Sequence, residues 1–277
     1  MLLSMDKIIQ PAMNDQYGVP APNIYNMETV AAVFEAAGEL RSPLIIAVLE
    51  RYDLEMLADI AKIYSGRFPQ IPAALHLDHG NKYESIVRAI RTGFTSVMID
   101  RSQCPFDENV RETKEIVKMA HAVGVSVEAE LGHVGMGVSY QNDPSAAFTQ
   151  TEDAVRFVQE TGVDCLAIAI GTAHGRYAGT PQLDFPRLKE IRSRVSVPLV
   201  LHGGSSTGDD NLVKAIKLGI TKLNVGTDLF TAGINAIKQY FEQEEFPVGS
   251  IAAQKNQLGY KQATMHYMTL LGSHDKF

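Results

Sequence analysis

Eight short apolar segments alternate with longer amphipathic segments along almost the whole chain. The apolar segments begin at Val19, Pro43, Ala73, Ser96, Ser126, Cys165, Pro198 and Lys222. Near-continuous apolar strands separated by helical segments are typical of a parallel sheet that helices cover on both faces. Eight such units predict a (β/α)8 TIM barrel and not an open doubly wound sheet. The first strand is followed by no GxGxxG, which disfavours a dinucleotide-binding fold.

Length and composition agree with a single barrel domain spanning residues 1–277, with a C-terminal helical tail. The 277 residues are 45% hydrophobic, and α/β barrels of this length commonly form one domain. The net charge of -7 disfavours general nucleic-acid binding, which needs a basic face. The apolar stretch in MLLSMDKIIQ is too short for a signal peptide to be expected. No apolar run approaches the ~20 residues of a membrane span, and two distant cysteines indicate no disulfide framework. We therefore expect a cytoplasmic protein with no nucleic-acid or membrane partner.

Polar side chains gather at the carboxyl ends of the predicted strands, where barrels carry their chemistry. The third strand, in AALHLDHG, ends in Asp78 and His79, and His174 and His202 follow the sixth and seventh strands. Three imidazoles that converge from three strand ends and leave a coordination position open form the pattern of a catalytic zinc site. The sequence therefore predicts a metal site above the barrel.

Several of these polar residues also have a purely structural interpretation. A lone histidine near a strand end is more often hydrogen-bonded in the core, and we expect this of His76 and His121. Asp78 could accept a hydrogen bond from a metal-ligating histidine. Asp100 could cap the next helix. Glu130 could belong to an internal ion pair, but an acid that ends an apolar strand favours a functional role.

Two glycine-containing segments follow the seventh and eighth strands. LHGGSSTG exposes the backbone N–H groups of Gly203, Gly204 and Ser205, and LNVGTDL does so at Gly226 and Thr227. Glycine also serves ordinary turns. Barrels, however, often bind phosphate at these two loops, so the pair predicts a phosphate site.

Taken together and in order, the segments resemble the class II, metal-dependent ketose-bisphosphate aldolases, which include the fructose- and tagatose-bisphosphate enzymes. The resemblance runs from about residue 17 to about residue 229 and rests on YGVPAPNIYNMET, HLDHG, SVMIDRS, SVEAELG, TGVDCLAIAIGTAHGRY, PLVLHGGSSTGDD and KLNVGTDL. It implies a Zn²⁺-dependent barrel enzyme, a homodimer or homotetramer, that joins or splits dihydroxyacetone phosphate and an aldehyde.

The resemblance implies that His79, His174 and His202 are the zinc ligands and that Asp78 is the catalytic acid/base at the oxygen of the aldehyde half. Retro-aldol cleavage leaves an enediolate, whose charge a zinc ion can stabilise as a Lewis acid. The alternative is a lysine Schiff base. We expect Lys222 to begin the eighth strand at the opposite rim, so the sequence favours the metal route.

Further positions match groups that hold substrate or a second ion in the family. Asp100 and Glu130 match acidic positions that hold an auxiliary monovalent or second divalent cation in some members. The expected substrate-binding residues are Asn23, Gly175, Gly203, Gly204, Ser205, Asn224, Val225, Gly226 and Thr227.

The sequence departs from the family where the aldehyde half would bind. Leu49 and Glu50 stand near the end of the second strand, where members commonly have Ser or Thr. The arginine that often holds a distal phosphate is missing, because no arginine follows Arg194. Lys82 is the replacement that we expect to hold a distal phosphate, with Lys261 as another candidate. The loop GHVGMGVSYQNDPSAAFTQTED also differs from the family pattern.

These observations favour a metal-dependent aldolase that reversibly cleaves a phosphorylated ketose of the fructose- or tagatose-bisphosphate type. An aldolase for a ketose 1-phosphate or an unusual sugar phosphate is the nearest alternative. A zinc-barrel hydrolase is less favoured, because no bridging carboxylate or modified lysine is suitably placed. A non-catalytic sugar-phosphate-binding barrel is also less favoured, because Asp78 and all three histidines are retained.

Overall fold

The computed structural model describes residues 2–135, 148–177 and 179–277. Residues 136–147, which make up much of the loop whose sequence differs from the family pattern, lie outside these ranges. The strands are β1 Val19–Pro22, β2 Leu44–Leu49, β3 Ala73–Gly80, β4 Ser96–Ile99, β5 Ser126–Leu131, β6 Cys165–Ile168, β7 Leu199–Leu201 and β8 Ile220–Val225. The helices are α1 Asp6–Asn14, α2 Met27–Leu40, α3 Leu54–Arg67, α4 Tyr83–Thr92, α5 Phe106–His121, α6 Thr151–Thr161, α7 Phe185–Arg194, α8 Asp209–Lys217, α9 Thr227–Gln243 and α10 Gly249–Leu270. None of these helices is both long and apolar enough to cross a membrane.

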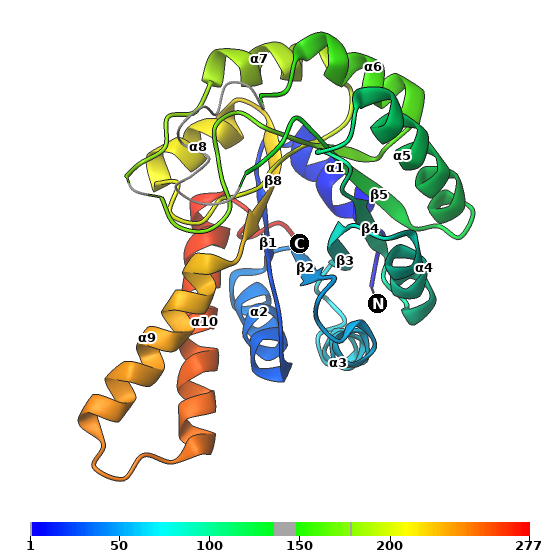
Figure 1. Ribbon diagram of the computed structural model, residues 1–277. Coiled ribbons are helices and arrows are strands. Elements are labelled where there is room, and N and C mark those ends of the chain that lie inside the picture. Colours follow the sequence, from blue (N-terminus) through cyan, green and yellow to red (C-terminus); the bar gives the residue numbers. More distant parts are fainter. Residues whose placement is uncertain (1, 136–147, 178) are drawn as a thin grey trace.

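The strands form one parallel sheet in the order β1-β8-β7-β6-β5-β4-β3-β2. A bridge between Asn23, just after β1, and Ala47 of β2 brings the two ends of the sheet together. The helices surround the sheet (Figure 1). The predicted (β/α)8 barrel is therefore confirmed, and each strand overlaps a segment that the sequence indicated, although β8 begins two residues before the expected Lys222.

Helix α1, which the sequence analysis did not single out, packs at the amino-terminal end of the barrel. Met5, Ile8 and Ile9 lie in one buried cluster with small inward-facing residues such as Ala21 and Ala47. The backbone N–H of Met5 donates to the hydroxyl of a serine that begins β5, at 3.0 Å. Because α1 covers this end of the barrel, a substrate site is expected at the opposite, carboxyl-terminal end.

Helices α9 and α10 form a long arm that extends away from the barrel (Figure 1). Its outer half bears exposed apolar side chains, including Phe241 at 51% and Phe246 at 76% exposure. Toward the barrel, α10 packs on α2, and the buried Tyr260 donates its hydroxyl to the backbone carbonyl of Asn23. The C-terminal helix therefore supports the strand end that carries a predicted site residue.

Candidate metal and substrate site

The pairing of β3 with β4 is irregular where HLDHG ends. β3 carries one more residue than β4 between Leu77 and Gly80, and His79 has a left-handed backbone with φ of 53°. Neighbouring strand residues normally point to opposite faces, and a bulge interrupts this alternation. As a result, Asp78 and His79 both line the same hollow at the mouth of the barrel.

Gly80 is required by the close packing of β3 against β4. A Cβ at this position would lie 2.4 Å from the carbonyl oxygen of Met98. Only glycine permits so close a backbone approach. The glycine after His79 therefore has a structural role.

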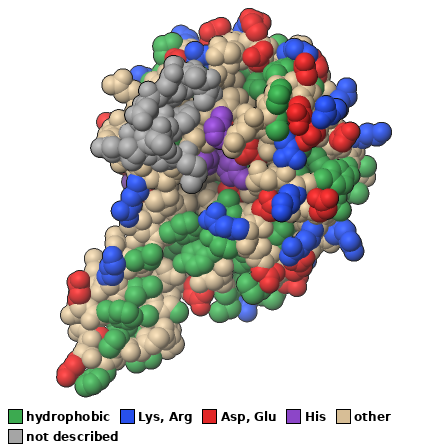
Figure 2. All heavy atoms as spheres, in the orientation of Figure 1, with side chains coloured by type: hydrophobic (Ala, Val, Ile, Leu, Met, Phe, Trp, Pro, Cys, Tyr) green, Lys and Arg blue, Asp and Glu red, His purple; other side chains and the backbone are tan. Residues whose placement is uncertain are grey.

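The three predicted histidine ligands converge at the carboxyl ends of β3, β6 and β7. One ring nitrogen from each of His79, His174 and His202 lies within 4.8 Å of the others. Nε2 of His79 and Nδ1 of His202 are 2.9 Å apart. Figure 2 shows histidine side chains grouped in a depression of this face.

Two of these rings are oriented by carboxylates on their other nitrogen. Nδ1 of His79 lies 2.7 Å from Asp100, and Nε2 of His202 lies 2.8 Å from Glu128. Metal-ligating histidines are usually held in this way, which fixes the tautomer and the ring orientation. The donor set therefore fits Zn²⁺, with the three inner nitrogens as ligands and an open side toward the hollow.

The same contacts separate the pKa values of the three rings. Burial lowers the pKa of His174 to about 4 and that of His202 well below its ordinary value, and the charge of His79 adds to both effects. Burial also acts to lower the pKa of His79, but Asp78 and the hydrogen bond to Asp100 outweigh it and raise the pKa to about 9. The cluster therefore carries one imidazolium beside two neutral rings.

A second group of possible ligands shares His79 with the first. Side-chain atoms of His79, Asp100 and Glu130 also lie within 4.8 Å of one another. Glu130 is buried, and its Oε2 has no hydrogen-bond partner in the described part of the chain. Burial, followed by the charge of Asp100, raises the pKa of Glu130 to about 8. Both predicted auxiliary residues thus lie beside the histidines, with one unpaired oxygen available to a cation or a proton.

Asp78 is buried and is held by two amides. Nδ2 of Asn23 donates to one carboxylate oxygen at 2.7 Å, and Nδ2 of Asn224 donates to the other at 2.9 Å. Burial would raise the pKa of Asp78, but the charge of His79, together with that of Lys222, outweighs it and lowers the pKa to about 2. Asp78 is therefore an ionised, oriented proton acceptor at the hollow.

Lys222 differs from the sequence-based expectation. It is the third residue of β8 and not the first, and its fully buried side chain lies among interior groups. Nζ donates to Oε2 of Glu128 and to Oδ1 of Asn224, each at 2.7 Å. Its ammonium is thus paired with Glu128, and it is connected to Asp78 through the side-chain amide of Asn224. Lys222 does not line the hollow, so the structure still gives no support to a Schiff base.

The loops after β7 and β8 interlock. Gly203 has φ of 68°, and a Cβ there would lie 2.4 Å from the carbonyl oxygen of Ala173. The hydroxyl of Ser205 accepts from the N–H of Gly226 at 3.3 Å and of Asp228 at 3.2 Å. Helix α9 starts at this point, so its positive end lies at the loop. This arrangement is typical of an anion site.

Most of the predicted residues line one hollow of about 420 Å³. Those that line it are Asn23, Asp78, His79, Asp100, His174, Gly175, Gly203, Gly204, Ser205, Asn224, Gly226 and Thr227. His202 and Glu130 are buried and do not line it. Val225 faces the outer core, and Lys82 lines a neighbouring hollow next to β2 and β3.

A family comparison bears directly on this site. The family model described as "Fructose-bisphosphate aldolase class-II" matches residues 3–276. The chain belongs to this family. It is therefore an enzyme of the carbon–carbon lyase type, as the sequence resemblance implied.

Solved structures agree with this aldolase assignment. The YdjI aldolase of Escherichia coli K12 is 34% identical, with a TM-score of 0.89 over 100% of this chain and 99% of that one. A provisional fructose-1,6-biphosphate aldolase from Coccidioides immitis is 30% identical, with a TM-score of 0.88 over 98% and 96% of the two chains. The fructose-bisphosphate aldolase of Campylobacter jejuni, at 21% identity and a TM-score of 0.85 over 100% and 97%, agrees in fold.

The sequence analysis of this aldolase missed some residues of the site. Arg51 and Gln103 line the hollow, and Phe230 of α9 forms part of its wall. Glu128 holds His202 from within the barrel. Glu128 alternates with Glu130 in SVEAEL, so a second acid on the inward face of β5 was a signal that the sequence contained.

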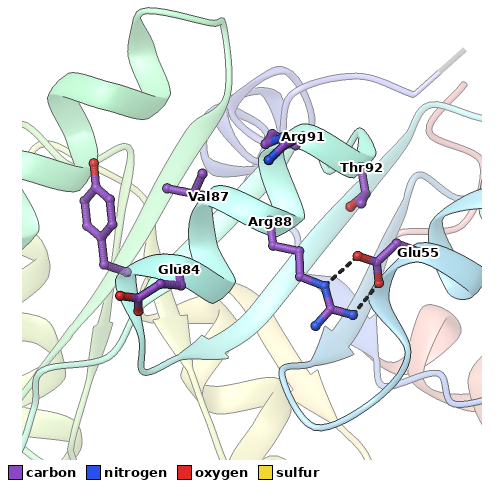
Figure 3. A pocket seen from close by; sticks show the side chains of 7 residues that line it. Glu55, Glu84, Val87, Arg88, Arg91 and Thr92 are labelled. Carbon is purple, nitrogen blue, oxygen red and sulfur yellow. Dashed lines mark hydrogen bonds and ion pairs between the residues drawn. The ribbon is translucent and has the colours of Figure 1, made fainter.

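A larger hollow, of about 630 Å³, lies on the outer side of the barrel by α3 and α4 (Figure 3). Arg88 and Glu55 pair with each other there through two hydrogen bonds. The pairing lowers the pKa of Glu55 to about 2. Neither metal-ligand group found in the described residues lies here, so the hollow at the barrel mouth is the better candidate for catalysis.

Proposed function

We propose that this aldolase is Zn²⁺-dependent and reversibly cleaves a phosphorylated ketose into dihydroxyacetone phosphate and an aldehyde. The observation that carries the proposal is the convergence of His79, His174 and His202 beside an ionised Asp78. Two of the imidazoles are backed by carboxylates, and Asp78 is fixed by two amides. A structural histidine cluster has no need of such a proton acceptor at its open side.

A Zn²⁺ ion held by the three inner nitrogens would supply Lewis-acid polarisation of the ketose carbonyl. Asp78 removes the proton from the hydroxyl on the carbon that becomes the aldehyde. The carbon–carbon bond next to that carbon then breaks, and its electron pair stays on the dihydroxyacetone phosphate half as an enediolate. A proton taken up at the carbon that carried the broken bond completes dihydroxyacetone phosphate. In the reverse direction, Asp78 returns the proton to the new hydroxyl oxygen. Asn23 and Asn224 keep the carboxylate aimed throughout.

The phosphate of the dihydroxyacetone half is proposed to bind the loops after β7 and β8. Backbone N–H groups there and the start of α9 supply partial positive charge without a basic side chain. Gly175, which follows His174, lines the same hollow and has a positive φ of 91°. Because it has no side chain, the substrate can approach the backbone closely at this position. The proposal uses the predicted residues of this half that line the hollow, and leaves out Val225, whose side chain packs in the outer core.

Activity with a panel of aldehydes and dihydroxyacetone phosphate, with and without a chelator, tests the proposal. We expect condensation that the chelator abolishes and Zn²⁺ restores. Asp78→Ala should keep the metal, lose cleavage by roughly 10²–10⁴-fold, and still exchange a C–H proton of dihydroxyacetone phosphate with solvent. Full activity in the chelator, or in Asp78→Ala, would contradict the proposal.

The same panel separates the alternatives. A bisphosphate-type enzyme works best with a phosphorylated aldehyde, whereas a ketose 1-phosphate enzyme works best with a neutral one. A non-catalytic barrel binds dihydroxyacetone phosphate but exchanges no proton from it. The retained Asp78, with its two amide donors, favours the catalytic alternatives.

We further propose that the enzyme acts in the cytoplasm as a homodimer or homotetramer. The exposed apolar side chains of the α9–α10 arm support an oligomer, because isolated arms with such faces are usually covered by a partner. Figure 2 shows hydrophobic side chains gathered on the arm. Sedimentation of the purified protein distinguishes the two assemblies from a monomer.

A further inference from the structure

We propose that Arg51 determines the substrate class by binding an anionic group, a phosphate or a carboxylate, at the far end of the aldehyde half. This inference rests on the proposed function. It makes the preferred substrate a ketose 1-phosphate with a second negative charge. It also assigns the charge recognition to the loop after β2, and not to Lys82 or to the C-terminal region.

The register of the sheet brings this loop to the aldehyde half. Leu49, the last residue of β2, pairs with Asp78 of β3. Arg51 follows Leu49 by two positions and lines the same hollow. Asp78 acts on the first carbon of the aldehyde product, so the rest of that product extends past Asp78. On the β2 side of Asp78, Leu49 and Arg51 form the wall of the hollow along which this part of the aldehyde would lie.

Aromatic contacts hold the guanidinium of Arg51 at this position. It lies 5.1 Å from the centre of the Tyr52 ring, and Nη2 is 3.4 Å from the Tyr52 hydroxyl oxygen. Tyr52 contacts Tyr25 at 6.3 Å between ring centres, and Tyr25 contacts Phe230 at 5.3 Å. Phe230 belongs to the wall of the hollow. The arginine thus lies at the end of an aromatic row that leads out from the site.

Charge makes Arg51 distinctive. Among the described residues that line the hollow it is the sole lysine or arginine, and within the described ranges it forms no ion pair. The adjacent Glu50 instead accepts a hydrogen bond from the backbone N–H of Asn81 at 2.9 Å. An arginine that is stacked on a ring and unpaired retains its fork of donors for a planar or tetrahedral oxyanion.

The test compares condensation rates with four aldehydes: glyceraldehyde 3-phosphate, neutral glyceraldehyde, 4-oxobutanoate and neutral 4-hydroxybutanal. We expect kcat/KM to favour one anionic member over its neutral counterpart. Arg51→Met should reduce that kcat/KM by about 10- to 150-fold, the loss expected for one charged hydrogen bond, mainly through KM. Rates with the neutral aldehydes should stay unchanged. The pair with the larger loss identifies phosphate or carboxylate as the natural group.

Arg67→Met is the matched control, because Arg67 also stacks on a tyrosine, at 4.9 Å from the centre of the Tyr64 ring, but lies on α3 away from the hollow. It should leave all four rates unchanged. Arg51→Lys should recover part of the loss. Equal losses with anionic and neutral aldehydes in Arg51→Met, or a selective loss in Lys82→Met instead, would overturn the inference. No condensation with any aldehyde in the unmodified enzyme would instead overturn the proposed function.

Discussion

Replacement of Lys222 by methionine tests whether the buried charges inside the barrel support the site. Lys222 and Glu128 are both fully buried, and Lys222 bonds Glu128 and Asn224 at 2.7 Å each. A hydrogen bond to a charged group contributes about 1.5–3 kcal/mol, so the two give about 3–6 kcal/mol. Removing one partner of a buried ion pair costs about 3–5 kcal/mol. We therefore expect Lys222→Met to lower the free energy of unfolding by about 3–5 kcal/mol.

Most of that loss comes from the unpaired carboxylate that remains at Glu128. A second substitution, Glu128→Gln, removes this charge and leaves an amide oxygen that can accept from His202. The double variant should therefore be at least as stable as Lys222→Met alone. Urea unfolding at equilibrium compares the unmodified protein, Lys222→Met, Glu128→Gln and the double variant. Lys62→Met, which breaks an exposed pair with Asp59, serves as the control and should change little.

Lys222→Met should also reduce turnover through Asn224. The ammonium fixes the amide oxygen of Asn224, and so aims the amide N–H at Asp78. Without it, the amide can rotate and Asp78 loses a donor. We expect kcat to fall while the bound metal stays stoichiometric. The reasoning is refuted if Lys222→Met costs less than about 1 kcal/mol, or if the effects of the two substitutions simply add.

Three further predictions follow from the same geometry. Zn²⁺ binding to chelator-treated enzyme at pH 7.5 should release about one proton per subunit, because the raised pKa of His79, about 9, keeps that ring protonated until the metal displaces the proton. Calorimetry in buffers of different ionisation enthalpy measures the number of protons released. His79→Ala should abolish this release. Gly203→Ala should raise KM for dihydroxyacetone phosphate more than tenfold, because its Cβ would meet a backbone carbonyl at 2.4 Å, whereas Gly66→Ala, with open space around it, should be harmless. Phe246→Ser should shift sedimentation toward smaller species without loss of bound zinc, and an unchanged assembly would exclude this part of the arm from the interface.

The sequence was sufficient to predict the fold and to identify the polar residues at the carboxyl ends of the strands. Apolar strand segments alternate with helical ones eight times, and this periodicity determines the barrel. Once the barrel is known, each polar residue at a carboxyl strand end must face the same opening. That rule alone brings His79, His174 and His202 together, and the structure agrees with it.

The sequence could not show how Asp78 and His79 reach the same hollow. Strict alternation would direct these neighbours to opposite faces of β3. The bulge before Gly80 resolves the conflict, and it depends on a register shift against β4 that only tertiary pairing defines. A left-handed φ at His79 costs of order 1–3 kcal/mol. The chain retains this strained backbone where the predicted metal ligand and proton acceptor must lie side by side.

Lys222 shows a second limit of sequence reasoning. A lysine early in a strand of an apolar sheet is expected at a rim, because a buried ammonium is costly. Here Glu128 and Asn224 supply its partners from two different strands. The sequence gives no distance between β5 and β8 side chains, so that compensation becomes visible only in the folded interior.

The two halves of the site differ in how they are built, and this difference determines what a sequence can reveal. In the proposed assignment, the dihydroxyacetone phosphate half uses backbone N–H groups and histidines whose positions follow from strand ends, so its motifs are recognisable in order. The proposed aldehyde half uses side chains after β2 and β3, and Arg51 there stacks on a ring, Tyr52, that comes from its own loop. Substitutions in this loop can therefore change the accepted aldehyde without disturbing Asp78 or the metal ligands. Substrate specificity in such a barrel can diverge while the carbon–carbon chemistry stays the same.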